Sequence, residues 1–224
     1  MRRALRTFSV VLIAAGVLLI ADAAATVLWE EPLSSLYARI QQGKLDDRLA
    51  ELERVGPSPI ERRALERLPD DRRRLRFAAR AAARRARSGD PLGRLEAGSI
   101  GLDVVVVQGT GGSALRSGPG HYSDTPLPGG RGTVAIAGHR TTYGAPFRNV
   151  DELERGDRIE LDTPYARFGY RVERTRIVAS TATWVTRRVA YDRLVLTACH
   201  PLYSAAQRIV VFARLERSEP RFGS

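Results

Sequence analysis

Residues 193–201 read Arg-Leu-Val-Leu-Thr-Ala-Cys-His-Pro, an apolar run that ends at Cys199. Its length and composition are typical of a buried β-strand. A second apolar run opens at Arg208, after a short loop over residues 200–207. Because a short loop between two strands favours an antiparallel hairpin, we expect Cys199 and Arg208 to lie together at one end of a β-sheet.

Cys199 is the only cysteine of the chain. A lone cysteine cannot form an internal disulfide, so it is either a small buried side chain or a nucleophile. Burial is the usual fate of a free cysteine. Here Thr197 and His200 give the position a polar setting at a strand end, which favours the nucleophile.

From residue 99 onward, short apolar runs alternate with turns rich in glycine and proline. This succession is typical of a β-sandwich or β-barrel, and a domain of about 125 residues is large enough for its own core. The expected strands cover residues 100–108, 133–137, 158–162, 170–179, 193–198 and 208–215.

His139 and Arg208 complete a group of catalytic candidates with Cys199. His139 follows the apolar run 133–137 just as Cys199 follows its own run. Together the three offer a nucleophile, a proton carrier and a fixed cationic donor for an oxyanion. The competing interpretations are a structural histidine and one more surface arginine.

Two other histidines compete for the role of His139. His200 adjoins Cys199, but neighbouring residues of a strand point to opposite faces, so its side chain should face away from the thiol. His121 lies in a loop opened by Gly118-Pro119-Gly120 and is predicted to be structural.

Several motifs around these residues resemble the sortase family, over about residues 99–216. Ala198 departs from the family, which commonly has a second threonine before the cysteine. The sortase motifs are Ala137–Thr141, Leu196–Pro201 and Arg208 after Ser204–Gln207, and those similar to class E are Gly118–Tyr122 and Thr141–Phe147.

The resemblance implies a mainly β fold, a closed eight-stranded sortase-type barrel, and a cysteine transpeptidase with Cys199, His139 and Arg208 as catalytic residues. Thr197 and Ala198 are candidates for substrate binding. Tyr143 either lines the substrate groove or packs on the barrel. No cofactor is expected, since one peptide bond is exchanged for another, and the scattered aspartates show no metal signature.

The implied substrates are secreted proteins with a C-terminal sorting signal of the Leu-Ala-x-Thr-Gly or Leu-Pro-x-Thr-Gly type. A thioester acyl-enzyme would pass the acyl group to an amine of a cell-wall precursor or a pilin. Two alternatives stay open from the residues: a membrane-anchored cysteine peptidase that uses water, and a non-catalytic binding domain of the envelope.

Residues 1–30 are predicted to form a cytoplasmic basic tip and a single-pass membrane anchor. An apolar stretch from Phe8 to about Trp29 is long enough to span a bilayer. Arginines before it and Glu30–Glu31 after it place the N-terminus in the cytoplasm and the catalytic domain outside. Small residues at 21–25 would allow a cleavable signal peptide, but the apolar character continues to Trp29 and favours an uncleaved anchor.

Residues 31–98 are expected to be a helical, Arg/Ala-rich stalk or linker before a catalytic domain over 99–224. Helices are predicted over 32–54, from a cap at Ser58 with Pro59 in the first turn, and over 70–87. The arginines contribute most of the net charge of +11, and the run 72–87 is either a binding stripe or a solvated stalk, of which we favour the stalk. A domain outside the cytoplasm excludes nucleic acid as a partner.

Overall fold

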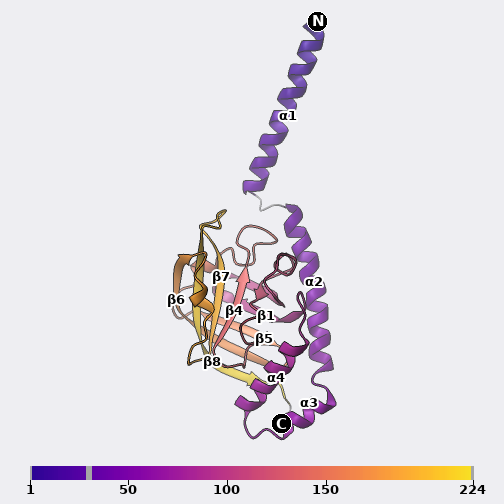
Figure 1. Cartoon of the computed structure of the whole chain (residues 1–224). Coiled ribbons are helices and arrows are strands. Elements are labelled where there is room, and N and C mark those ends of the chain that lie inside the picture. The colour runs from indigo at the N-terminus through magenta and orange to yellow at the C-terminus, as the bar shows by residue number, and fades with distance from the viewer. Residues whose placement is uncertain (1, 29–31, 223–224) are drawn as a thin grey trace.

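The computed structural model describes residues 2–28 and 32–222. The helices α1 to α4 come first along the chain and the strands follow, with the short helix α5 between β2 and β3 (Figure 1). The helices are α1 (Arg2–Leu28), α2 (Pro32–Val55), α3 (Pro59–Glu66), α4 (Asp71–Arg85) and α5 (Gly112–Leu115), with 3₁₀ turns η1 (Gly98–Ile100), η2 (Val150–Glu152) and η3 (Thr183–Thr186). The strands are β1 (Pro91–Ala97), β2 (Leu102–Gln108), β3 (Gly120–His121), β4 (Thr133–Gly138), β5 (Arg158–Thr163), β6 (Ala166–Ala179), β7 (Arg193–His200) and β8 (Gln207–Pro220).

The eight strands close into a barrel in the order β1-β2-β3-β4-β7-β8-β6-β5. β2 pairs with β3 and β4 pairs with β7 in parallel, whereas the other neighbours are antiparallel. Closure pairs every strand on both sides and leaves no open sheet edge. The predicted closed eight-stranded β-barrel is therefore confirmed.

Side chains of successive strand residues alternate between the barrel interior and its outer surface, as strand geometry requires. Along β7, Leu194, Leu196 and Ala198 belong to the interior core cluster. Val195 instead belongs to a second cluster on the outside of the barrel, which η3 covers with Val185. The barrel wall beside β7 is thus buried on both faces.

The barrel begins at Pro91, upstream of Ser99, where the sequence analysis expected the catalytic domain to start. The pair Leu92-Gly93 was interpreted as a helix break, yet it lies within β1. A Cβ atom at Gly93 would lie 2.4 Å from the backbone oxygen of Asp162 in β5. Glycine is required here because two backbones approach closely.

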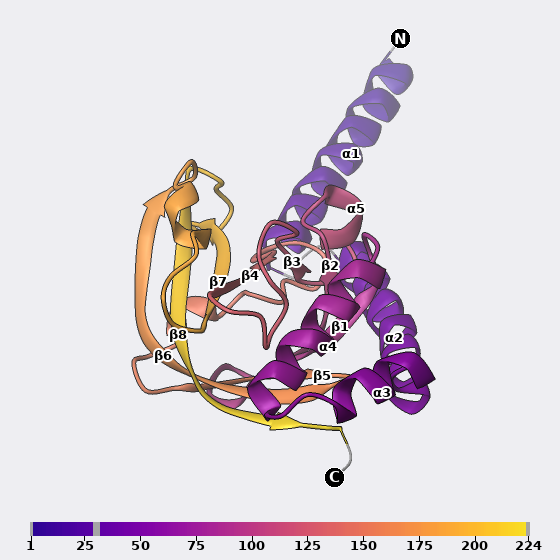
Figure 2. The same cartoon turned by 60° about the horizontal axis from the view of Figure 1, so that its bottom comes forward.

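From Pro32 to Arg85 the chain is mainly helical, as predicted, but the helices pack against the barrel (Figure 2). Ser58 caps α3 in a capping box with Glu61, and Pro59 occupies its first turn. Leu75 of α4 contributes to the core cluster of the barrel, so α4 covers one end of it. The expected solvated stalk is therefore wrong for this part of the chain.

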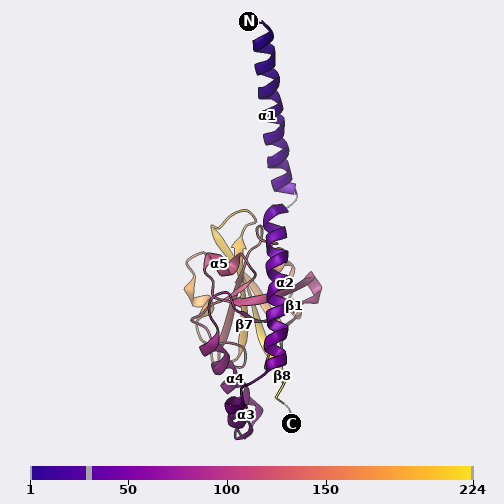
Figure 3. The same cartoon turned by 90° about the vertical axis from the view of Figure 1, so that its right-hand side faces the viewer.

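α2 runs along the side of the barrel (Figure 3). Its Gln42 side chain donates to the backbone oxygens of Val105 (3.1 Å) and Ser117 (2.7 Å), and accepts from the amide of Val105 (2.7 Å). Leu45 and Leu49 pack in a cluster with residues of β2. These contacts fix α2 to β2 through both hydrogen bonds and apolar burial.

α1 projects beyond the barrel at the end where α2 begins (Figures 1 and 3). No helix within the described residues is long and apolar enough to cross a membrane. The predicted transmembrane segment, residues 1–30, thus lacks support from the structure. Residues 1, 29 and 30 of it lie outside the described residues.

We expect Gln42→Ala to destabilise the fold by about 1–3 kcal/mol, because it leaves the amide of Val105 buried without its acceptor. Gln41→Ala is the matched control, since the neighbouring residue points about 100° away around the same helix. Guanidinium unfolding of both variants provides the measurement. Equal midpoints for the two variants would contradict a docking role for Gln42.

Candidate active site

The parallel pairing of β4 with β7 places the histidine beside the cysteine. The register pairs Ala137 with Thr197 and Gly138 with Ala198. His139 follows β4 directly, and Cys199 is the next residue of β7. Both predicted catalytic residues therefore come to the same end of the barrel, although 60 positions separate them in the sequence.

The antiparallel pairing of β7 with β8 brings in the third residue. Cys199 is the direct register partner of Arg208, as the predicted hairpin required. On β8, Val210 and Phe212 face the outer cluster, and Arg208 lies on the same side by alternation. The side chain of Cys199 lies on the same face of β7 as that of Val195. The thiol of Cys199 and the guanidinium of Arg208 therefore both lie on the outer surface of the barrel.

Gly138 explains why His139 also faces outward. A Cβ atom at Gly138 would lie 2.5 Å from the ring of Phe147, a fully buried core residue. The position before the histidine therefore faces the interior. The Phe147 amide donates to the His139 carbonyl at 2.9 Å, which fixes the backbone where β4 ends.

The electrostatic setting of His139 suits a proton carrier. Its side chain is partly buried, and this burial lowers the pKa of the imidazole below its ordinary value of about 6.5. The lowered pKa favours the neutral ring, which is the form that can accept a proton. Cys199 itself is partly exposed, so a substrate can reach it.

Arg208 is held by the loop that precedes it. Its Nη1 donates to the backbone oxygens of Ala205 and Gln207, each at 2.9 Å. A guanidinium carries five N–H donors in a planar fork, so other donors of Arg208 can serve an oxyanion while Nη1 keeps these bonds.

Arg140 supports the site from the inner side and was not singled out from the sequence. It is 3% exposed and pairs with Asp151 at 2.6 Å. Its guanidinium donates to the backbone oxygen of Arg148 at 3.0 Å and approaches the Cys199 oxygen and His200 Nδ1 at 3.5 Å each. The buried charge thus ties the end of β7 to the loop after β4. Its adjacency to His139 was the only sequence signal.

The structure separates the two candidates for substrate binding on β7. Thr197 shares the outer face with Cys199, but it is 3% exposed and its hydroxyl bonds the Tyr122 hydroxyl at 3.0 Å. Ala198 belongs to the interior core cluster and is also 3% exposed. Its side chain points into the barrel, away from the thiol, because strand residues alternate.

The other histidines lie outside the candidate site. His121 is 2% exposed and bonds Gln108 at 3.0 Å through Nδ1 and Thr125 at 3.0 Å through Nε2. Burial lowers the pKa of His121 to about 4, so it stays neutral as a structural residue. His200 lies on the Arg140 side of β7, away from the thiol.

Tyr143 lies beside the site, between the barrel and α2. Its ring centroid is 5.3 Å from that of His139 and 6.5 Å from that of Tyr37 in α2. These contacts place the Tyr143 ring against both the candidate proton carrier and the helix.

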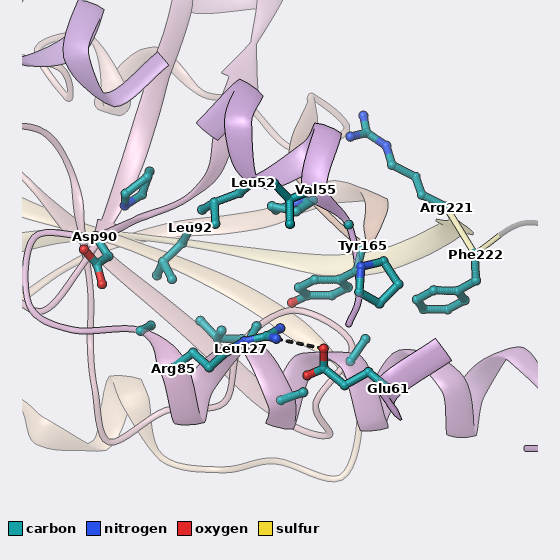
Figure 4. A pocket seen from close by; sticks show the side chains of 18 of the residues that line it. Leu52, Val55, Glu61, Arg85, Asp90, Leu92, Leu127, Tyr165, Arg221 and Phe222 are labelled. Atoms are coloured by element: carbon teal, nitrogen blue, oxygen red, sulfur yellow. Dashed lines mark hydrogen bonds and ion pairs between the residues drawn. The ribbon is translucent and has the colours of Figure 1, made fainter. Parts of the chain in front are cut away.

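A cavity of about 470 Å³ lies elsewhere, between the C-terminal end of α2, α3, α4 and the barrel (Figure 4). Leu52, Val55, Leu92 and Tyr165 give it an apolar lining, and an ion pair between Arg85 and Glu61 borders it at 2.8 Å. The catalytic candidates do not line it.

Comparison with known proteins identifies the family. The family model of the sortase domain matches residues 95–216. Sortase D of Bacillus subtilis is 32% identical over 141 residues, which cover 61% of this chain and 70% of that protein. Sortase SrtE1 of Streptomyces coelicolor is 30% identical over 138 residues, 54% of this chain and 39% of the relative. The match thus spans well under half the length of that Streptomyces relative.

A solved structure of sortase E from Streptomyces avermitilis shares the fold. It is 30% identical, covers 60% of this chain and 93% of its own, and superimposes with a TM-score of 0.56. The family model matches more than half of the 224 residues. The barrel, the outward-facing cysteine at the end of β7 and these matches lead to one conclusion: the chain belongs to the sortase family of cysteine transpeptidases and is similar to its class E.

Proposed function

We propose that the protein cleaves C-terminal sorting signals of secreted proteins and transfers the acyl part to an amine, with Cys199, His139 and Arg208 as catalytic residues. The observation that supports the proposal is the strand register, which pairs Cys199 with Arg208 and sets the end of β4, directly before His139, beside Ala198. The similarity to class E supports a signal of the Leu-Ala-x-Thr-Gly type and an amine of a cell-wall precursor or pilin as acceptor.

In the first half-reaction, the Cys199 sulfur forms a bond to the scissile carbonyl carbon while His139 takes the thiol proton. The carbonyl oxygen becomes an oxyanion, to which Arg208 donates hydrogen bonds. The carbon–nitrogen bond then breaks, and His139 gives its proton to the leaving amine. A thioester on Cys199 remains.

In the second half-reaction, the acceptor amine attacks the thioester carbon. His139 removes a proton from the attacking nitrogen, and Arg208 again stabilises the oxyanion. The carbon–sulfur bond breaks, and the new amide leaves the thiol as it was. Because one amide replaces another, no nucleotide is consumed.

We also propose that residues 1–30 attach the protein to the cell membrane in a single pass, with the barrel outside the cytoplasm. Support comes from the apolar stretch 8–29 and from Arg2, Arg3 and Arg6 before it. Large apolar side chains of α1 are exposed to the surroundings, among them Phe8 at 65%, Ile13 at 67% and Ile20 at 72%. A lipid environment would cover that apolar surface.

Wild-type protein incubated with a Leu-Ala-x-Thr-Gly peptide should gain the mass of the acyl fragment on Cys199, and an added amine should release the fragment as an amide. Cys199→Ala should show neither adduct nor cleavage, because the chain has no second cysteine. Intact-protein mass spectrometry checks both. Cleavage by Cys199→Ala at the wild-type rate would disprove the mechanism, and release of only the free acid in the presence of amine would indicate a peptidase.

His139→Gln should lower the acylation rate by about 100-fold or more, since general acid–base catalysis typically contributes that much. His200→Gln serves as the control, because its ring lies on the opposite face of β7. Acylation rates from quenched-flow mass spectrometry compare the two. A stronger effect at His200 than at His139 would overturn the assignment of the proton carrier.

The full chain should sediment with membranes, and external protease should digest the barrel in spheroplasts. The physical reason is the free energy of about 0.8 kcal/mol gained for each CH₂ group that leaves water. Fractionation and immunoblotting provide the measurement. A barrel that is found in the soluble fraction, or that resists protease until the cells are lysed, would contradict the proposed topology.

A further inference from the structure

Tyr143 lies where the loop after β4, helix α2 and the loop after α5 meet. Its ring packs on His139 with centroids 5.3 Å apart, and the edge-to-face contact with Tyr37 of α2 measures 6.5 Å. Arg116 lies over the same ring, with its guanidinium carbon 5.9 Å from the centroid. Among the described residues, the Tyr143 ring thus links His139 to α2.

The backbone around Tyr143 adopts a conformation that needs outside support. Tyr143, Gly144 and Ala145 have φ angles of 52°, 73° and 42°. Side chains other than glycine rarely occupy this left-handed region, and such strain persists only where surrounding contacts over-determine it. Two of these three residues carry a side chain, so the loop must be held in place.

The first turns of α2 provide that support. The Tyr143 amide donates to the Ser34 hydroxyl at 3.3 Å. Gly144 lies against α2 so closely that a Cβ atom there would be 3.3 Å from the Cβ of Ala38. Since Gln42 fixes the next turn of α2 to the barrel, the helix is a firm base for the loop.

We propose that Tyr143 is a positioning residue for His139, and that Ser34 and Tyr37 hold it in place, so that the start of α2 forms part of the active site. The proposal rests on the catalytic role assigned to His139. That imidazole must exchange a proton first with the thiol and then with an amine, and it comes from the end of a strand rather than from its interior. The Tyr143 ring packs against one side of the imidazole and so limits the imidazole to orientations that serve both the thiol and the amine.

A change in this contact should alter the chemical step rather than peptide binding. We expect Tyr37→Ala to lower kcat for transpeptidation about threefold to tenfold with little change in KM, in line with the strength of an aromatic pair. Tyr37→Phe keeps the edge contact and should restore most of the rate. Ile40→Ala is the matched control, since this residue of the same helix is 52% exposed. Equal kcat values in Tyr37→Ala and Ile40→Ala would overturn the proposal.

Nuclear magnetic resonance of the histidine rings tests the positioning without any turnover. The chain has three histidines, and His139→Gln identifies the signal of His139. In the full-length protein, Tyr37→Ala should shift the His139 ring signal and leave those of His121 and His200 in place, whereas Ile40→Ala should shift none. An unmoved His139 signal in Tyr37→Ala disproves the positioning role, even if the enzyme is active. If the His139 signal shifts in Tyr37→Ala but the wild-type protein forms no acyl adduct, the positioning contact is supported and the proposed activity is rejected.

Discussion

The parallel pairing of β4 with β7 is the constraint on which the active site depends. It joins two strands 60 residues apart, and its register decides which residue stands beside Cys199. A slip of one position would turn every side chain of β4 to the other face, and His139 would point into the barrel. Val134 and Ile136 of β4 fill the interior core and the small Ala135 packs in the outer cluster, so a slip would also exchange large and small side chains between the two faces. The same packing that stabilises the barrel therefore specifies the catalytic geometry.

Helix α2 links the two ends of the molecule. It has 24 residues, which at about 1.5 Å per residue span roughly 36 Å. Its first turns contact the loop that carries Tyr143, and its last turns line the cavity beside α3 and α4. An ion pair between Arg94 of β1 and Asp46 and another between Arg221 and Glu53 (2.9 Å) add to its attachment. Such exposed pairs contribute little each, so Gln42 and the apolar contacts carry most of the docking.

Local patterns in the sequence predicted the hairpin that joins Cys199 to Arg208, because a short loop between two strands favours antiparallel pairing. The approach of His139 depends on a non-local register, which a single sequence does not determine; the resemblance to a family supplied it. The alternation rule that turned His200 away from the thiol also turns Ala198 inward, so the sequence could have placed the Ala198 side chain in the core. Gly93 was interpreted as a helix break, but glycine is required there by a close approach of the β5 backbone. That approach is not visible in the local sequence. The burial of Arg140 likewise depends on residues distant in sequence.

The single, partly exposed cysteine has a consequence for the redox chemistry of the protein. A thiol that reaches solvent can be oxidised to a sulfenic acid, and many proteins reverse this damage with a second cysteine that forms a disulfide. Here no other cysteine exists in the chain, so reversal requires a thiol from outside. Without one, oxidation proceeds to sulfinic acid, which is irreversible in most proteins. An oxidising environment would therefore inactivate an enzyme that depends on this thiol, and such an enzyme would need an external reductant to stay active.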